Sequence, residues 1–255
     1  MKRLIHLATT ILALAPAALA APNRTTGKIS FPPAPYPPAA DKKGVVGNVV
    51  LTADVGADGK LGGILVLASS SPLLDDAAVE HLRRSKFSAA MEDGKPVATI
   101  LNAVVRFRND RAKLRETGTM PAPILGNLAV TPIDEKGKTA APEGFSVEPS
   151  DKGIRGELDV DLPKGSGSRT FHVVVVDRFP GGRTVTLLDR KIAPEGPGNS
   201  LSATVLRMVD RARHDEAGIH TLVVTIDGKN AGGARYRVAG DAAATPTRPK
   251  SRPKK

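Results

Sequence analysis

The chain contains no cysteine and no tryptophan among its 255 residues. Without cysteine it cannot form disulfides, use a thiolate nucleophile, bind a metal through sulfur or carry a lipid on a cysteine. Aromatic residues make up only 3% of the chain, which disfavours recognition of polysaccharides by stacking on exposed rings. Its folded state must therefore be stabilised by packed apolar cores without covalent cross-links.

Long hydrophobic runs are also scarce, and the first one lies at the N-terminus. Met1, Lys2 and Arg3 form a basic start, and residues 4–19 are rich in Leu and Ala. The run is short for a membrane span and contains Pro16, whereas Ala18 and Ala20 place small residues where a signal peptidase cleaves. The sequence predicts a signal peptide over 1–20, a mature chain that begins at Ala21, and a periplasmic location. The alternative is a retained helix that anchors the protein in the inner membrane, facing the periplasm.

Positive charge exceeds negative charge, with a formal net charge of +11. The last segment, TPTRPKSRPKK, carries five positive charges, no negative ones and three prolines, so residues 241–255 are predicted to form a disordered basic tail. Such a tail could contact anionic lipid or polysaccharide of the envelope, or could serve only for solubility. Nucleic acid is not an expected partner of an exported protein.

A Pro-rich stretch over 21–35 is predicted to be an extended linker, and the first folded unit follows over 36–108. The unit contains, in order, an alternating strand, a turn, a second strand, a helix with Asp75 as its N-cap, and a closing strand. The first strand, the turn, the second strand and the closing strand lie at 47–55, 57–60, 63–68 and 97–107. The helix lies before the closing strand, where Leu74, Ala77, Ala78, His81 and Leu82 recur at helical spacing on one face. This order predicts an α+β fold, with one helix on one face of an antiparallel sheet.

The order and spacing of several short motifs in this unit resemble a known family. The motifs are Tyr36-Pro37, Gly47, Asp58-Gly59-Lys60, Ser69-Ser70, Pro72-Leu73-Leu74-Asp75, Ala77-Ala78, Arg83-Arg84, Phe87, Ala90, Asp93-Gly94-Lys95-Pro96-Val97 and Arg106-Phe107. Taken together, they make the unit similar to the C-terminal domain of the TonB family of energy transducers.

The resemblance implies that the closing strand pairs with an extended peptide of an envelope protein, which in the family is the N-terminal box of an outer-membrane transporter. In strand addition of this kind, backbone amides supply affinity and alternate side chains supply selectivity. The partner-binding residues implied are Tyr36, Pro37, Val97, Thr99, Leu101, Ala103, Val105 and Phe107. No cofactor is implied.

The second half of the chain shows an all-β pattern. A charged and Pro-containing linker over 109–123 leads into residues 124–240, where about seven strands are separated by Gly, Pro and Asp turns. The segment 201–209 fits either a strand or a helix. The pattern predicts a β-sandwich, and its last strands, around Asp227-Gly228, resemble those of bacterial immunoglobulin-like modules.

Catalytic and metal-binding motifs are absent from the sequence. His214 and Asp215, with His220, lack the spacing of a zinc helix, and Ser69 to Ser71 has no nucleophile context. We therefore expect a non-enzymatic, TonB-like binding module in the periplasm. Two alternatives stay open: an anchored TonB-type transducer for outer-membrane transport, and an envelope hydrolase or metal enzyme that uses the histidines of the second half.

Overall fold

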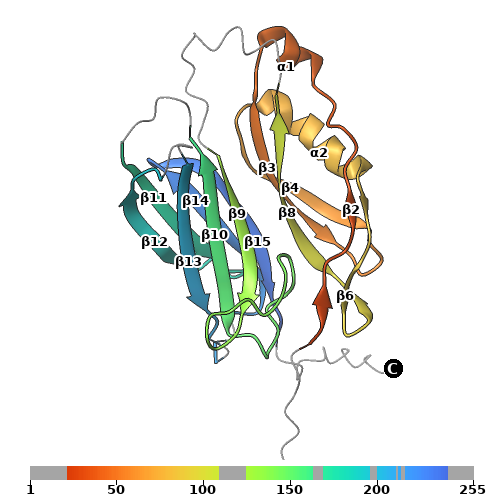
Figure 1. Ribbon diagram of the computed structural model, residues 1–255, viewed down its shortest axis with the longest axis vertical. Coiled ribbons are helices and arrows are strands. Elements are labelled where there is room, and N and C mark those ends of the chain that lie inside the picture. The colour runs from red at the N-terminus through yellow and green to blue at the C-terminus, as the bar shows by residue number, and fades with distance from the viewer. Residues whose placement is uncertain are drawn as a thin grey trace, which may run out of the picture.

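The structure is a computed structural model that describes residues 22–108, 125–162, 169–195, 200–210, 212–213 and 216–240. These residues form two β-rich domains with few helices, which lie side by side (Figure 1). The expected cleavage site at Ala18, Ala20 and Ala21, the linker over 109–123 and the tail over 241–255 lie outside the described residues. Within the described part of the chain, no helix has the length and apolar character needed to cross a lipid bilayer.

The first domain is built on a three-stranded antiparallel sheet with the order β4-β3-β8. Its strands are β3 (Gly47–Val55), β4 (Leu61–Ser69) and β8 (Thr99–Phe107). The 3-10 helix η1 (Pro72–Leu74) and helix α2 (Asp75–Arg84) follow β4 and cover one face of the sheet (Figure 1). Leu74, Ala78 and Leu82 recur at helical spacing and are fully buried against this face.

The prediction that Asp75 caps the helix is wrong. The residue before α2 is Leu74, and it makes no capping hydrogen bond through its side chain. The Ser71 hydroxyl instead accepts a hydrogen bond from the Leu73 N–H at 3.4 Å, at the start of η1. Because η1 runs directly into α2, the chain becomes helical before Asp75, and the capping side chain is therefore needed earlier.

The segment predicted as a linker over 21–35 is extended, but it also pairs with the first domain at two places. Strand β1 (Arg24–Thr25) joins β6 (Ala90–Glu92), which pairs with β7 (Lys95–Val97). Strand β2 (Ile29–Ser30) pairs with β5 (Lys86–Phe87), and the short helix α1 (Pro38–Lys43) follows. Strands of two residues have no alternation to detect, so the sequence did not reveal this pairing.

The second domain consists of two antiparallel sheets packed face to face, consistent with the predicted all-β domain. One sheet has the order β13-β10-β9 and the other β12-β11-β14-β15. The strands are β9 (Gly126–Ile133), β10 (Gly153–Asp161), β11 (Phe171–Arg178), β12 (Thr184–Ile192), β13 (Ser200–Met208), β14 (Gly218–Ile226) and β15 (Lys229–Val238). The segment that fitted either a strand or a helix is therefore strand β13.

Alternation and turn chemistry explain the strands of this domain. Along β10, Leu158 and Val160 are buried between exposed acidic neighbours, and they join Val173 and Leu222 in one apolar core. The predicted final hairpin is confirmed. Asp227 and Gly228 both adopt positive φ angles, of 50° and 75°, as a tight two-residue turn between twisted strands requires.

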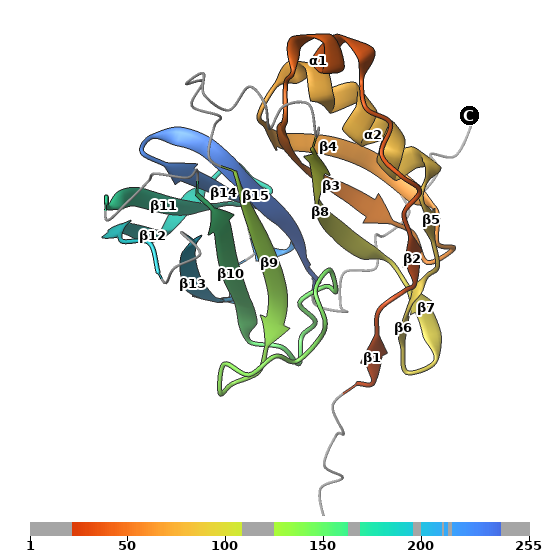
Figure 2. The same cartoon turned by 45° about the horizontal axis from the view of Figure 1, so that its top comes forward.

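The two domains contact each other through β15, which crosses the sheet face that α2 leaves open (Figures 1 and 2). Gly232 on β15 has a positive φ of 132°, and a Cβ atom there would lie 3.0 Å from the Gly126 carbonyl oxygen and 3.4 Å from Val50, so the position favours glycine. Val50 is 2% exposed and Thr52 is completely buried, although both point away from α2. Both faces of the first sheet are therefore covered.

Candidate functional site

The outer edge of β8 is the strand edge that the sequence assigned to peptide pairing. Because Asn48 O accepts from the Ser70 N–H, the even-numbered residues of β3 direct their backbone groups toward β4. The odd-numbered residues of β3 therefore bond to β8, and the even-numbered residues of β8 face outward. In the described residues, β8 has β3 as its only strand partner, so the backbone groups of Val104 and Arg106 lie at an open edge.

The side chains predicted to bind the partner lie mostly inside the domain. Leu101, Val105 and Phe107 pack into the core beneath α2, where Val105 and Phe107 are 6% and 2% exposed. Ala103 lies between them on the same face, Thr99 lines a small cavity, and Val97 belongs to β7 rather than to the closing strand. These side chains hold β8 in position, whereas the outward backbone groups of β8 belong to its even-numbered residues.

Tyr36 and Pro37 support the same strand from outside the sheet. The Tyr36 hydroxyl donates a hydrogen bond to the Val45 carbonyl, and its ring packs edge-on against Phe107 with centroids 5.9 Å apart. Burial raises the pKa of Tyr36 above its ordinary value, so the hydroxyl remains a donor. Pro37 precedes α1 as its N-cap residue. Tyr36 thus fixes the end of β8 at which the edge is open.

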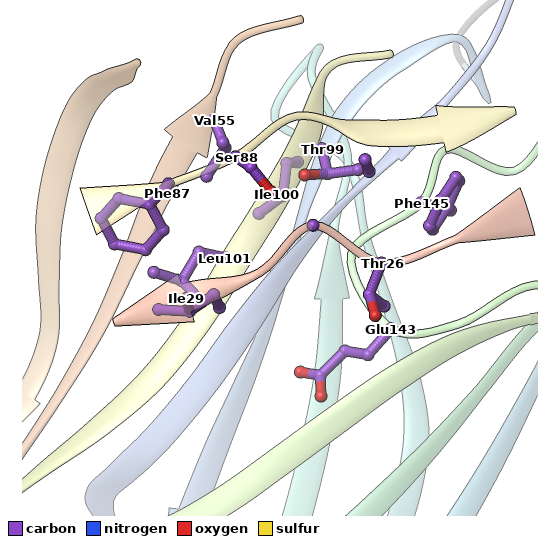
Figure 3. A pocket seen from close by; sticks show the side chains of 12 residues that line it. Thr26, Ile29, Val55, Phe87, Ser88, Thr99, Ile100, Leu101, Glu143 and Phe145 are labelled. Carbon is purple, nitrogen blue, oxygen red and sulfur yellow. The ribbon is translucent and has the colours of Figure 1, made fainter. Parts of the chain in front are cut away.

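The beginning of β8 is covered by a loop of the second domain. The Ile100 N–H, which faces outward, donates to Gly144 O at 2.8 Å. Next to this contact lies a cavity of about 70 Å³. Figure 3 shows Ile29, Phe87 and Leu101 on one side of this cavity, with Thr26 and Glu143 on the other. The available edge of β8 is therefore its second half.

Asn102 is a residue at this interface that the sequence analysis missed. Its side-chain amide donates to Arg235 O at 3.0 Å and accepts from the Arg235 N–H at 2.8 Å, as a paired strand would. The Arg235 guanidinium also reaches Asp54 on β3 at 3.3 Å. The available signal was an amide in the middle of β8, between the apolar residues Leu101 and Ala103.

Glu143 lies beside Asn102 with an altered proton affinity. Desolvation raises the pKa of its carboxyl to about 7, although hydrogen bonds from the Asn102 side chain and the Val130 backbone oppose this shift. The folded state therefore binds this proton more tightly than the unfolded chain does. Stability should fall as pH rises from about 4.5 to about 7, and the loss should persist above that range.

Replacing Glu143 with glutamine removes this cost, so we expect the variant to be more stable than the parent at pH 8. Because Glu143 is exposed to solvent, which screens its charge, we expect a gain of at most about 1 kcal/mol. Urea unfolding at pH 8 and at about pH 3.5 measures the effect, which should disappear at the lower pH, where the carboxyl is protonated in both the folded and the unfolded state. Glu157→Gln, at an exposed position, serves as the control. Equal stability of parent and Glu143→Gln at pH 8 would contradict the assignment.

The loop over 147–151 contacts both β1, near the start of the described chain, and the segment after β15, near its end. Arg24 on β1 donates to both Asp151 oxygens at 3.1 and 2.9 Å, and its Nε lies 2.5 Å from a Glu92 oxygen. The side chains of Arg24 and Asp151 are only 1% and 4% exposed. The same loop bonds to the end of the second domain, since the Ala239 N–H donates to Val147 O at 3.0 Å.

A cluster of charged side chains is buried inside the second domain. Asp177 accepts from the Tyr236 hydroxyl at 2.8 Å, lies 2.6 Å from Arg207 Nε, and lies 3.2 Å from His220 Nδ1. Glu216 pairs with Arg207, and more distantly with Arg183 at 3.1 Å. Burial and the nearby Asp177 carboxylate raise the pKa of Tyr236, which keeps its hydroxyl protonated.

This cluster also determines what His220 can do. His220 is completely buried, with Nε2 2.8 Å from the Glu216 carbonyl oxygen and its ring stacked on Tyr236. Because both ring nitrogens are bonded and solvent is excluded, this histidine has no access to a substrate. His214 and Asp215 lie outside the described residues. Among the residues that the structure does describe, no group of three or more His, Asp or Glu side chains is arranged to hold a metal ion.

Comparison with known proteins identifies the first domain. Residues 32–108 match the family model described as Gram-negative bacterial TonB protein C-terminal, which confirms the resemblance for this part of the chain. Two curated relatives, both called Protein TonB, come from Xanthomonas campestris pv. campestris strains B100 and ATCC 33913. Each is 40% identical over 76 residues, which cover 29% of this chain and 34% of the relative. The chain thus spans about a third of the length of the curated relatives it matches.

Proposed function

We propose that this chain is a periplasmic binding module whose TonB-like α+β domain docks an extended peptide of an envelope protein by strand addition to β8. The observation that carries the proposal is the row of outward-facing backbone groups at Val104 and Arg106. They lie on the strand that the family resemblance assigns to pairing. The TonB family implies outer-membrane transporters as partners, and a non-enzymatic role.

The surroundings of β8 suit a preorganised docking edge. The Gly144 carbonyl holds Ile100 at one end of the strand, and the ring of Tyr36 packs on Phe107 at the other. A strand already fixed at both ends loses little conformational entropy when a peptide pairs with it. The side chain of Arg106 is exposed at this edge and could pair with a carboxylate of the partner.

Arg106→Pro tests the proposal. Proline lacks the outward N–H and is tolerated where that group does not join the ladder, so the sheet should stay folded. We expect binding of a synthetic peptide that carries a transporter's N-terminal box to weaken at least tenfold, as measured by fluorescence anisotropy. Arg106→Ala keeps the backbone donor and should retain most of the binding. If the proline variant binds as tightly as the parent does, docking does not use this edge.

The anchored-transducer alternative is favoured by the names of the relatives, since both are TonB proteins. The two hypotheses differ in the N-terminus of the protein recovered from cell fractions. A soluble periplasmic species that begins at Ala21 supports a released module. An intact, membrane-bound N-terminus supports a transducer for outer-membrane transport, with the second domain as an addition.

A further inference from the structure

The sheet of the first domain has a second open edge, on β4. Thr52 directs its backbone groups toward β4 and is paired with Leu65, so the neighbouring residues Ile64 and Val66 face outward. Among the described residues, β3 is the only strand paired with β4. Since β3 lies between β4 and β8, this edge is on the opposite side of the sheet from the edge discussed above.

The β4 edge is unprotected over Ile64 to Val66, between two register shifts of its pairing with β3 and before Leu67, whose carbonyl accepts from the Asn230 side chain at 2.8 Å. Its sequence, LGGILVLAS, contains no charged residue and no proline. Leu65 is 51% exposed and Val66 is 38% exposed. Natural proteins commonly guard exposed edges with lysine, proline or a covering segment, because unpaired backbone groups attract other strands. An uncharged, partly apolar edge is therefore suited to pairing with another chain.

A positively charged groove lies beside the first half of β4. It has a volume of about 690 Å³ and runs between residues 59–64 and residues 83–87, at the end of α2. Three cations line it, namely Lys60, Arg83 and Lys86, and no acidic side chain does. Lys60 is paired with Asp58 at 3.1 Å, whereas among the described residues Arg83 and Lys86 have no ion-pair partner.

We propose that the β4 edge and this groove bind an extended acidic peptide segment of a partner protein. The peptide would pair with the outward backbone groups of Ile64 and Val66, as in strand addition generally. Successive side chains of a strand point to opposite faces. Carboxylates on one face would meet Arg83 and Lys86, and apolar side chains on the other face would cover Leu65. Because the cations of the groove lie on only one face of the β4 edge, the expected peptide alternates acidic with apolar residues.

The site is independent of the proposed docking at β8. A peptide on β4 would leave the outward groups of Val104 and Arg106 free, because a whole strand separates the two edges. The first domain would then hold two extended segments at once, one at each side of its sheet. A variant of one edge should not affect binding at the other.

The test uses the full chain and a fluorescein-labelled nine-residue peptide in which glutamate alternates with valine. Val66→Pro removes an outward N–H at a position where proline is compatible with the ladder to β3. The double variant Arg83→Glu and Lys86→Glu reverses two exposed charges of the groove and should leave the fold intact. We expect both variants to weaken binding at least tenfold, whereas Arg106→Pro changes it less than twofold. A peptide that alternates lysine with valine should not bind.

Several outcomes would overturn the inference. Binding that survives both Val66→Pro and the charge reversal excludes the β4 edge. Loss of binding in Arg106→Pro instead would place the acidic peptide on β8, which contradicts this inference but leaves the proposed function standing. If sedimentation shows that the protein self-associates, and Val66→Pro abolishes this association while no peptide binds, the occupant is a second copy of the chain.

Discussion

Replacing Asp177 with alanine lowers the free energy of unfolding by about 3–5 kcal/mol, because it leaves a buried arginine and a buried histidine without their shared carboxylate. Arg207 is 6% exposed, and His220 and Asp177 are completely buried, so water cannot replace the lost partner. The Tyr236 hydroxyl would also lose its acceptor. In thermal unfolding followed by circular dichroism, a drop of roughly 10–20 °C is expected.

A matched control is available at an exposed aspartate–histidine pair of the same domain. Asp189 lies 2.6 Å from His172, but the two side chains are 62% and 47% exposed. Solvent screens such a pair, so Asp189→Ala should leave the melting temperature almost unchanged. If Asp177→Ala and Asp189→Ala have the same melting temperature, the buried cluster does not stabilise the second domain in the way its geometry indicates.

Asp151→Ala is expected to destabilise the protein by about 2–3 kcal/mol, because it removes one of the two carboxylates that neutralise the buried guanidinium of Arg24. Glu92 would remain as the other partner, which makes this loss smaller than that at Asp177. The same change removes the acceptor of the Glu148 N–H, at 2.8 Å in the parent. Both losses act on the loop that joins the two domains.

Hydrogen exchange can localise this effect. Amides of residues 23–25 and of β6 should exchange faster in Asp151→Ala, since apart from the Arg24 contacts this segment is held by two residue pairs to β6 and by the hydrogen bonds between Asn23 and Asp93. Glu135→Ala, which removes an exposed partner of Lys152, serves as the control and should leave exchange unchanged. Unchanged protection of β1 in Asp151→Ala would show that strand pairing alone holds this segment.

Periodicity and turn residues were sufficient to predict most of the long strands, but neither the short strands β1, β2, β5 and β6 nor how the sheets pack against one another. Along β3, the alternation of Val49, Leu51 and Ala53 correctly indicated a face buried by a helix. Val50 and Thr52 are equally buried, because β15 covers the other face. Alternation within β3 carries no information about β15, which contacts it from 181 residues further along the chain at the Asp54–Arg235 pair.

The closing strand of the candidate site was predicted apart from Val97, which lies in β7, and the role of its side chains in partner binding stays a prediction. Choosing every second residue from Thr99 to Phe107 selected the side chains that face the helix, since these are the apolar ones. An edge strand offers its partner the backbone groups of the residues in between, such as Val104 and Arg106. Gly144 and Arg235 of the second domain form hydrogen bonds with Ile100 and Asn102 of β8. These bonds depend on the packing of the two domains, which the residue pattern of β8 does not reveal.

The loop over 147–151 has a geometric consequence for the whole molecule. It bonds to Arg24, near the first described residue, and to Ala239, near the last one. Both ends of the described chain therefore leave the protein at the same pole, as Figure 1 also shows. Anything that fastens the protein at either end would hold it by this pole, with α1 directed away. Strands β4 and β8 would then lie between the attached pole and α1, whichever end provides the attachment.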